Sequence, residues 1–79
     1  MSLESKVKQI FKDVLGISPD EIQPDQPLNQ DMGMDSTEMV EITVAIKKEF
    51  NLDIGNNAIK KDMTFNQVIQ FLQKQGVAV

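Results

Sequence analysis

The chain has 79 residues, a formal net charge of -4, and no Cys, His, Trp, Tyr or Arg. A chain this short buries only about 60% of the surface that its unfolded state exposes, so we expect one domain over residues 1–79 and no large substrate cleft. The missing residue types exclude thiol and imidazole nucleophiles and the usual zinc ligand sets, and the negative charge argues against nucleic acid as a partner.

The first expected element is an amphipathic helix that begins near Leu3 and is closed by Gly16. Glycine fits the left-handed conformation that ends many helices. Apolar residues recur at three- and four-residue spacing, with charged residues on the other side. The apolar set is Leu3, Val7, Ile10, Phe11, Val14 and Leu15.

A long loop is expected from Ile17 to Met34, because this stretch holds the three prolines and few apolar residues. A capping-box spacing at Ser18 and Glu21, with Pro19 between them, indicates one short turn. Ordered loops of this length are uncommon, so the segment is either functional or contains a further element. The apolar residues expected to hold it against the helices are Ile17, Ile22, Leu28, Met32 and Met34.

The second helix is expected from Ser36 to Phe50, with Asp35 as its cap and Glu38 completing a capping box. Val40 and Val44 point away from the core face, and form either a small docking strip bordered by charge or part of the packing under the loop. The core face consists of Met39, Ile42, Thr43, Ile46 and Phe50.

After Asn51 the helical pattern weakens, and one short helix is expected around Ala58 to Lys61. The last helix follows Thr64, which has Gln67 at capping-box spacing, and ends before Gly76. Its apolar face consists of Phe65, Val68, Ile69, Phe71 and Leu72. These elements predict an all-α fold: a small four-helix bundle of three longer helices and one short helix, with a long loop between the first and second helices.

Charge is unevenly distributed, because no lysine occurs between Lys12 and Lys47. An acidic stretch of this kind attracts basic surfaces on partner proteins, although it would equally serve to keep a small domain soluble. The acidic residues of the interval are Asp13, Asp20, Glu21, Asp25, Asp31, Asp35, Glu38 and Glu41.

Ser36 is the candidate for chemistry, because it opens the second helix. Unpaired backbone N–H groups and the positive end of the helix dipole favour a phosphate ester there. By spacing alone, however, Ser36 is an ordinary helix-start residue with a capping role. No metal site is expected, since Gly33 and Ser36 fall where a calcium loop over 31–41 would need a ligand and a glycine.

The segment Asp31-Met32-Gly33-Met34-Asp35-Ser36 resembles the Asp-Leu-Gly-x-Asp-Ser signature of the acyl carrier protein family. The family's Val-Glu and Glu-Phe positions follow as Val40-Glu41 and Glu49-Phe50. The similarity extends over the whole chain in the order of helix, long loop, signature, second helix, short helix and final helix.

This resemblance implies a carrier and not an enzyme. Ser36 matches the serine that a phosphopantetheinyl transferase esterifies from coenzyme A, so 4'-phosphopantetheine is the implied covalent cofactor and supplies the sulfur that the chain lacks. Asp35 matches the acid that helps to present the serine. The implied function is to carry acyl intermediates as thioesters in fatty acid or related biosynthesis, such as polyketide or specialised lipid pathways.

The resemblance also implies partners and a shelter for cargo. Synthase and acyl-transfer enzymes with basic patches would dock on the second helix, at the positions of Glu38, Val40, Glu41, Val44 and Glu49. A monomer that contacts neither nucleic acid nor membrane is implied. The residues that match the walls of an acyl-chain pocket are Ile46, Phe50, Ile54, Ile59, Val68 and Phe71, which are equally ordinary core residues.

Thr37 stands where the family usually has leucine, and Lys47-Lys48 replaces an acidic stretch. These departures leave the attachment site untouched and leave open whether the chain is a housekeeping fatty-acid carrier or one dedicated to a particular pathway. Two rival hypotheses are a carrier of an aminoacyl or D-alanyl unit, and an unmodified acidic adaptor in which Ser36 only caps a helix. The absence of cysteine and the charged segment from Ser2 to Lys12 predict a cytoplasmic protein without a signal peptide.

Overall fold

Helices make up most of the computed structural model, which describes residues 2–78. In chain order they are α1 (Leu3–Leu15), the 3-10 helix η1 (Pro19–Glu21), α2 (Leu28–Asp31), α3 (Ser36–Phe50) and α4 (Phe65–Lys74). Within residues 2–78 the only β-type contact is an isolated bridge between Pro27 and Thr64. The predicted all-α fold, with three longer helices, one short helix and a long loop between the first two longer helices, is confirmed. The outer positions of the predicted 1–79 domain, 1 and 79, lie outside the described residues.

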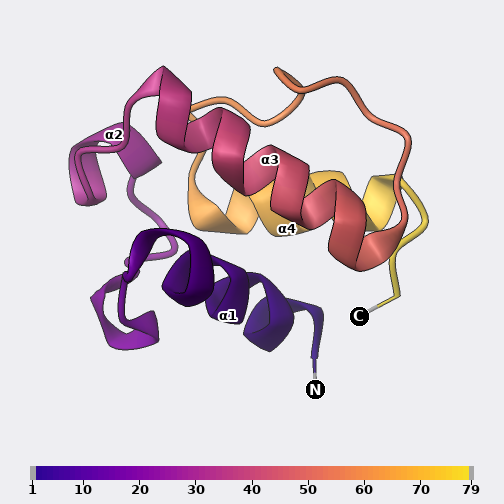
Figure 1. Ribbon diagram of the computed structural model, residues 1–79. Helices are drawn as coiled ribbons and strands as arrows, with labels where there is room; N and C mark the ends of the chain where they lie inside the picture. Colours follow the sequence, from indigo (N-terminus) through magenta and orange to yellow (C-terminus); the bar gives the residue numbers. More distant parts are fainter. Residues whose placement is uncertain (1, 79) are drawn as a thin grey trace.

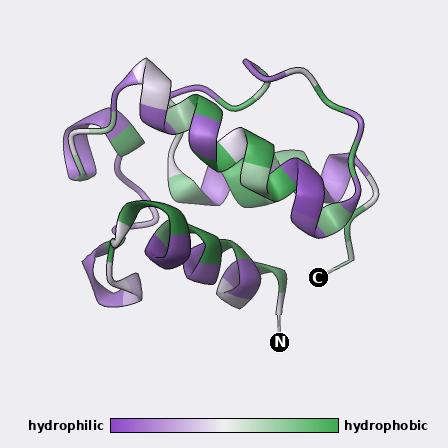
Figure 2. Ribbon diagram, in the orientation of Figure 1, coloured by the Kyte–Doolittle hydropathy of each residue, from purple (hydrophilic) through white to green (hydrophobic). Residues whose placement is uncertain are grey.

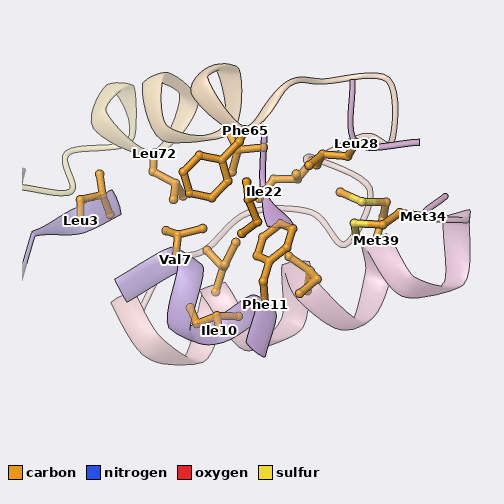
Figure 3. Close-up of a cluster of buried hydrophobic side chains, with 14 residues drawn as sticks. Leu3, Val7, Ile10, Phe11, Ile22, Leu28, Met34, Met39, Phe65 and Leu72 are labelled. Atoms are coloured by element: carbon orange, nitrogen blue, oxygen red, sulfur yellow. The ribbon is translucent and has the colours of Figure 1, made fainter. Parts of the chain in front are cut away.

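The three longer helices surround one apolar core (Figures 1 and 3). Each turns its apolar face inward and leaves its polar face to solvent, as the colouring of α1 in Figure 2 makes plain. Phe11 of α1 and Phe65 of α4 meet edge to face at the centre, with ring centroids 5.9 Å apart. The fully buried side chains around them include Val7, Leu28, Ile42, Ile46, Ile59, Val68 and Leu72.

The helix ends follow the local signals of the sequence. Gly16 has φ 70° and closes α1 in the left-handed conformation. Two of the three expected capping boxes form, Asp35 with Glu38 at the start of α3 and Thr64 with Gln67 at the start of α4. At Ser18 the turn forms as η1, but the Ser18 side chain makes no capping hydrogen bond, so that box is wrong.

The loop between α1 and α3 is held to the core by its apolar residues, as expected. Ile22, Leu28 and Met34 are buried, whereas Ile17 and Met32 are half-buried against the core. The loop also contains α2, which has no side-chain cap at its start because Pro27 occupies the N-cap position. Of the two readings left open for this loop, the presence of a further element is confirmed.

The backbone N–H groups at the start of α2 are satisfied by the segment that precedes α4. The N–H groups of Leu28 and Asn29 donate to the carbonyl oxygens of Met63 and Lys61, both at 2.9 Å. The first N–H groups of a helix have no partner inside the helix. A distant stretch of main chain therefore caps α2 and joins the two long connections of the fold.

Two expectations about local structure are wrong. No helix forms at Ala58 to Lys61, where the chain makes turns instead. Gly55, Asn56 and Asn57 are poor helix formers, and the following carbonyl groups bond to α2 and not along a helix. Val14 is 38% exposed although its spacing places it on the apolar side of α1. It lies in the last helical turn, where burial depends on neighbouring elements and not on periodicity.

The connection between α3 and α4 determines what surrounds the start of α3. It leaves the C-terminal end of α3 and runs back along that helix toward its first turn (Figure 1). Near the C-terminal end the Lys47 ammonium group donates to Asn56 Oδ1 at 3.0 Å, and Ile59 is buried further on.

Within residues 2–78 no helix combines the length and the apolar character needed to cross a bilayer.

Candidate functional site

Ser36 is the first residue of α3 and its side chain is exposed. The turn that leads to it is set by two residues of the signature. Gly33 has φ 64°, a conformation that favours glycine, and Met34 is 2% exposed and inserts into the core beside Met39, as Figure 3 shows. A left-handed residue followed by a buried anchor therefore presents Ser36 at the surface.

Asp35, and not Ser36, caps α3. Asp35 Oδ1 accepts a hydrogen bond from the N–H of Glu38 at 2.8 Å, and Glu38 Oε1 accepts one from the N–H of Asp35 at 3.1 Å. Within residues 2–78 the Ser36 hydroxyl has no hydrogen-bond partner, so no structural task in the fold occupies it. The reading of Ser36 as the capping residue is wrong.

The first turn of α3 offers a favourable electrostatic environment for an anion on Ser36. The backbone N–H groups of Ser36 and Thr37 find no acceptor among residues 2–78, because the first helical bonds are donated by Met39 and the residues after it. These N–H groups and the dipole of the 15-residue helix favour negative charge at this end. The exposed hydroxyl, the free donors and the dipole suit a phosphate ester at Ser36.

An open pocket of about 460 Å³ adjoins Ser36. It lies between the first turns of α3 and the segment 56–62 that passes them. Its base is apolar, formed by the buried side chains of Met39 and Ile59 and the half-buried Val40, and its rim is polar. The rim residues are Asn56, Asn57, Lys60, Lys61 and Asp62. A flexible chain with apolar and amide groups fits such a lining, which makes the pocket compatible with a phosphopantetheine arm.

The residues expected to meet partners lie on the outer side of α3. Glu41 and Glu49 are exposed, whereas Glu38 is half-buried because it serves the capping box. Val40 and Val44 are half-buried and lie outside the core cluster. Val40 also lines the pocket beside Ser36.

The six residues expected to wall an acyl-chain pocket are not gathered around one cavity. Ile46 and Val68 are fully buried in the core, and Phe50 packs against it half-buried. Ile59 lines the pocket beside Ser36, whereas Phe71 is half-buried and lines a separate, polar pocket with Lys74. Ile54 is half-buried.

Sequence reasoning missed the residues on the far rim of the pocket. The residues of this rim line the same pocket as Ser36 only because the connection before α4 folds back along α3; they are Asn56, Asn57, Lys60 and Lys61. The available signal was a pair of adjacent lysines in an acidic chain directly after an apolar anchor, Ile59. That signal does not say which part of the fold the lysines face.

Comparison with known proteins supports the sequence resemblance. Residues 5–72 match the family model described as "Phosphopantetheine attachment site". The chain is 35% identical over 78 residues to an acyl carrier protein of Bdellovibrio bacteriovorus, an alignment that covers 99% of this chain and 100% of the relative. It is also 32% identical over 75 residues to acyl carrier proteins from two strains of Nitratidesulfovibrio vulgaris, covering 95% of this chain and 99% of each relative.

Proposed function

The chain belongs to the acyl carrier protein family, and from this premise we propose that Ser36 is the residue that bears its 4'-phosphopantetheine. Members of this family carry acyl intermediates as thioesters on that covalent arm, and this protein is a carrier in the same sense and not a catalyst. The observation that supports Ser36 is its exposed, unbonded hydroxyl at the start of α3, where Asp35 has taken over the capping role.

The attachment chemistry requires little of the chain itself. A transferase would join Ser36 Oγ to the phosphorus of 4'-phosphopantetheine, with loss of the hydroxyl proton and release of 3',5'-ADP from coenzyme A. The chain contributes an accessible oxygen and an anion-stabilising helix end. When bound, the arm supplies the thiol that a chain without cysteine cannot supply.

Asp35 has a second role in this proposal. Its carboxylate is exposed and adjoins Ser36, while one of its oxygens accepts from Glu38. A carboxylate oxygen has more than one lone pair, so Asp35 can cap α3 and still interact with the transferase that acts on Ser36. We assign it the presentation of the serine.

The partners are proposed to be a phosphopantetheinyl transferase and the synthase and acyl-transfer enzymes of fatty acid or related biosynthesis in the cytoplasm. They would dock through basic patches on the side of α3 that carries Glu38, Val40, Glu41, Val44 and Glu49. Three of these residues are carboxylates, and their attraction to a basic surface would speed the encounter in a salt-dependent way. Because a carrier must leave each enzyme, the interface is expected to be small and the protein to act as a monomer.

The acyl chain is proposed to enter between α3, the segment 54–59 and α4. The walls would be Ile46, Phe50, Ile54, Ile59, Val68 and Phe71, several of which are fully buried without a bound chain. Entry would therefore require these side chains to separate. The half-buried positions of Phe50, Ile54 and Phe71 mark the edge at which separation would begin.

Intact-mass analysis after incubation with a phosphopantetheinyl transferase and coenzyme A tests the proposal. The wild-type chain should gain one phosphopantetheine, Ser36→Ala should gain none, and Ser5→Ala, which removes another exposed helical hydroxyl, should behave as the wild type. Failure of the wild type to gain mass would favour the unmodified adaptor. The mass of protein recovered from its native host would show whether the arm is present and what cargo it carries.

A further inference from the structure

The pocket beside Ser36 carries a charge that is opposite to the overall charge of the chain. Two of the eight lysines, Lys60 and Lys61, lie side by side on its rim, opposite the first turn of α3. Both are exposed. A solvated pair of surface lysines would be unremarkable by itself, so the case depends on how the pair is held and on what faces it.

The backbone of Lys60 and Lys61 is anchored in the fold, although the side chains are not. The Lys61 carbonyl accepts from Asn29 of α2, and the Lys60 carbonyl accepts from Met63 at 3.1 Å. The Lys60 N–H donates to Met63 Sδ, and the preceding residue, Ile59, is buried. Main-chain atoms therefore fix this segment at the pocket, and the two ammonium groups remain available for binding.

The ammonium groups have no established counter-charge. Among residues 2–78 the one ion pair within 4.0 Å joins Lys8 and Glu4 on α1, remote in sequence from this rim. Asp62 also lines the pocket but makes no ion pair with either lysine. Ser36 also lines the pocket, and its N–H has no acceptor among residues 2–78. Donors from two elements thus line one pocket, and no carboxylate among residues 2–78 forms an ion pair with either lysine.

We propose that this pocket is a subsite for an anionic group on the moiety attached at Ser36, with Lys60 and Lys61 as its recognition residues. The inference rests on the proposed attachment at Ser36. Two sources of the anion share this chemistry: the phosphodiester that links the arm to Ser36, and a carboxylate at the far end of a dicarboxylic acyl cargo on an arm that folds back. The apolar base of Met39, Val40 and Ile59 accommodates the aliphatic part of either one.

The experiment compares four forms of the whole protein: unmodified, bearing the arm alone, bearing a butyryl thioester and bearing a succinyl thioester. The two acyl groups have equal chain length and differ in the terminal carboxylate. A transferase with coenzyme A, butyryl-CoA or succinyl-CoA prepares the three loaded forms, and intact mass verifies each. Thermal midpoints and the amide ¹H–¹⁵N shifts of Asn56, Asn57, Lys60 and Lys61 are then measured in the wild type, in Lys60→Gln/Lys61→Gln and in the charge-matched control Lys6→Gln/Lys74→Gln.

Addition of the recognised anion should raise the thermal midpoint by about 2 to 4 °C relative to the form that lacks that anion, as expected for a partly exposed ion pair in a domain of this size. This rise in midpoint, called the step below, should vanish in Lys60→Gln/Lys61→Gln and persist in the control variant. It should shrink in about 1 M salt, where the Debye length is about 3 Å. A step on adding the arm identifies the phosphodiester, and a step between butyryl and succinyl identifies the cargo carboxylate.

The proposal is overturned if every loading step is the same in the wild type and in Lys60→Gln/Lys61→Gln, or if the shift changes avoid the segment 56–61. That result differs from failure of the attachment itself. If Ser36 is not the attachment residue, either the wild type gains no mass or Ser36→Ala gains the same mass as the wild type.

Discussion

Substitution of Asp35 separates two tasks that the structure places on one side chain. Asp35→Ala removes the 2.8 Å hydrogen bond to the N–H of Glu38, whereas Asp35→Asn keeps an acceptor and removes only the charge. Because the site is exposed, water can partly replace the lost acceptor. We therefore expect Asp35→Ala to cost about 1 kcal/mol, which lowers the midpoint by about 4 to 8 °C in a domain of this size. Asp35→Asn should cost about half of that or less.

The assay pairs thermal unfolding with the initial rate of modification by a phosphopantetheinyl transferase. If the carboxylate presents Ser36, both variants should be modified more slowly than the wild type, although only Asp35→Ala is clearly destabilised. A wild-type midpoint for Asp35→Ala would refute the reasoning about the capping box. A wild-type modification rate for Asp35→Asn would refute the presentation role.

Two further substitutions test the frame around the site. Gly33→Ala should lower the free energy of unfolding in urea by about 1 to 2 kcal/mol, because Gly33 has φ 64° while the space around an added Cβ is open. Gly55→Ala serves as the control, since φ of Gly55 is not in the left-handed region. An equal loss of stability in both variants would contradict the role of the left-handed conformation. Ile59→Ala should cost about 2 to 5 kcal/mol and should weaken hydrogen-exchange protection of the Leu28 and Asn29 amides, which bond to the segment that Ile59 anchors. Unchanged protection of those amides would show that the anchor and the bonds are independent.

Much of the fold could be predicted because its signals are local. The caps of α3 and α4 involve residues three positions apart, so Asp35 with Glu38 and Thr64 with Gln67 are visible in the sequence. The signature loop could be placed on the core because Ile22, Leu28 and Met34 are isolated apolar residues in a polar stretch.

The rest depended on contacts between distant segments. A short helix was expected at 58–61, but none forms there. The short helix of the fold is α2, whose first N–H groups donate to the carbonyl groups of Lys61 and Met63. Neither segment carries a local signal for that pairing. For the same reason Ser36 could be singled out as the candidate site from the sequence but the opposing rim could not, since Lys60 and Lys61 reach the pocket through the path of the connection. The exposure of Val14 in the last turn of α1 is a tertiary effect of the same kind.

The hydrogen bonds that join α2 to the segment 61–63 run between peptide groups, and this has an evolutionary consequence. Any amino acid except proline offers both peptide groups, so mutation at positions 60 and 61 leaves the fastening between these segments intact. Selection can therefore vary the chemistry at the mouth of the pocket while the architecture stays constant. Related carriers built in this way could diverge in what they accept without first having to regain stability.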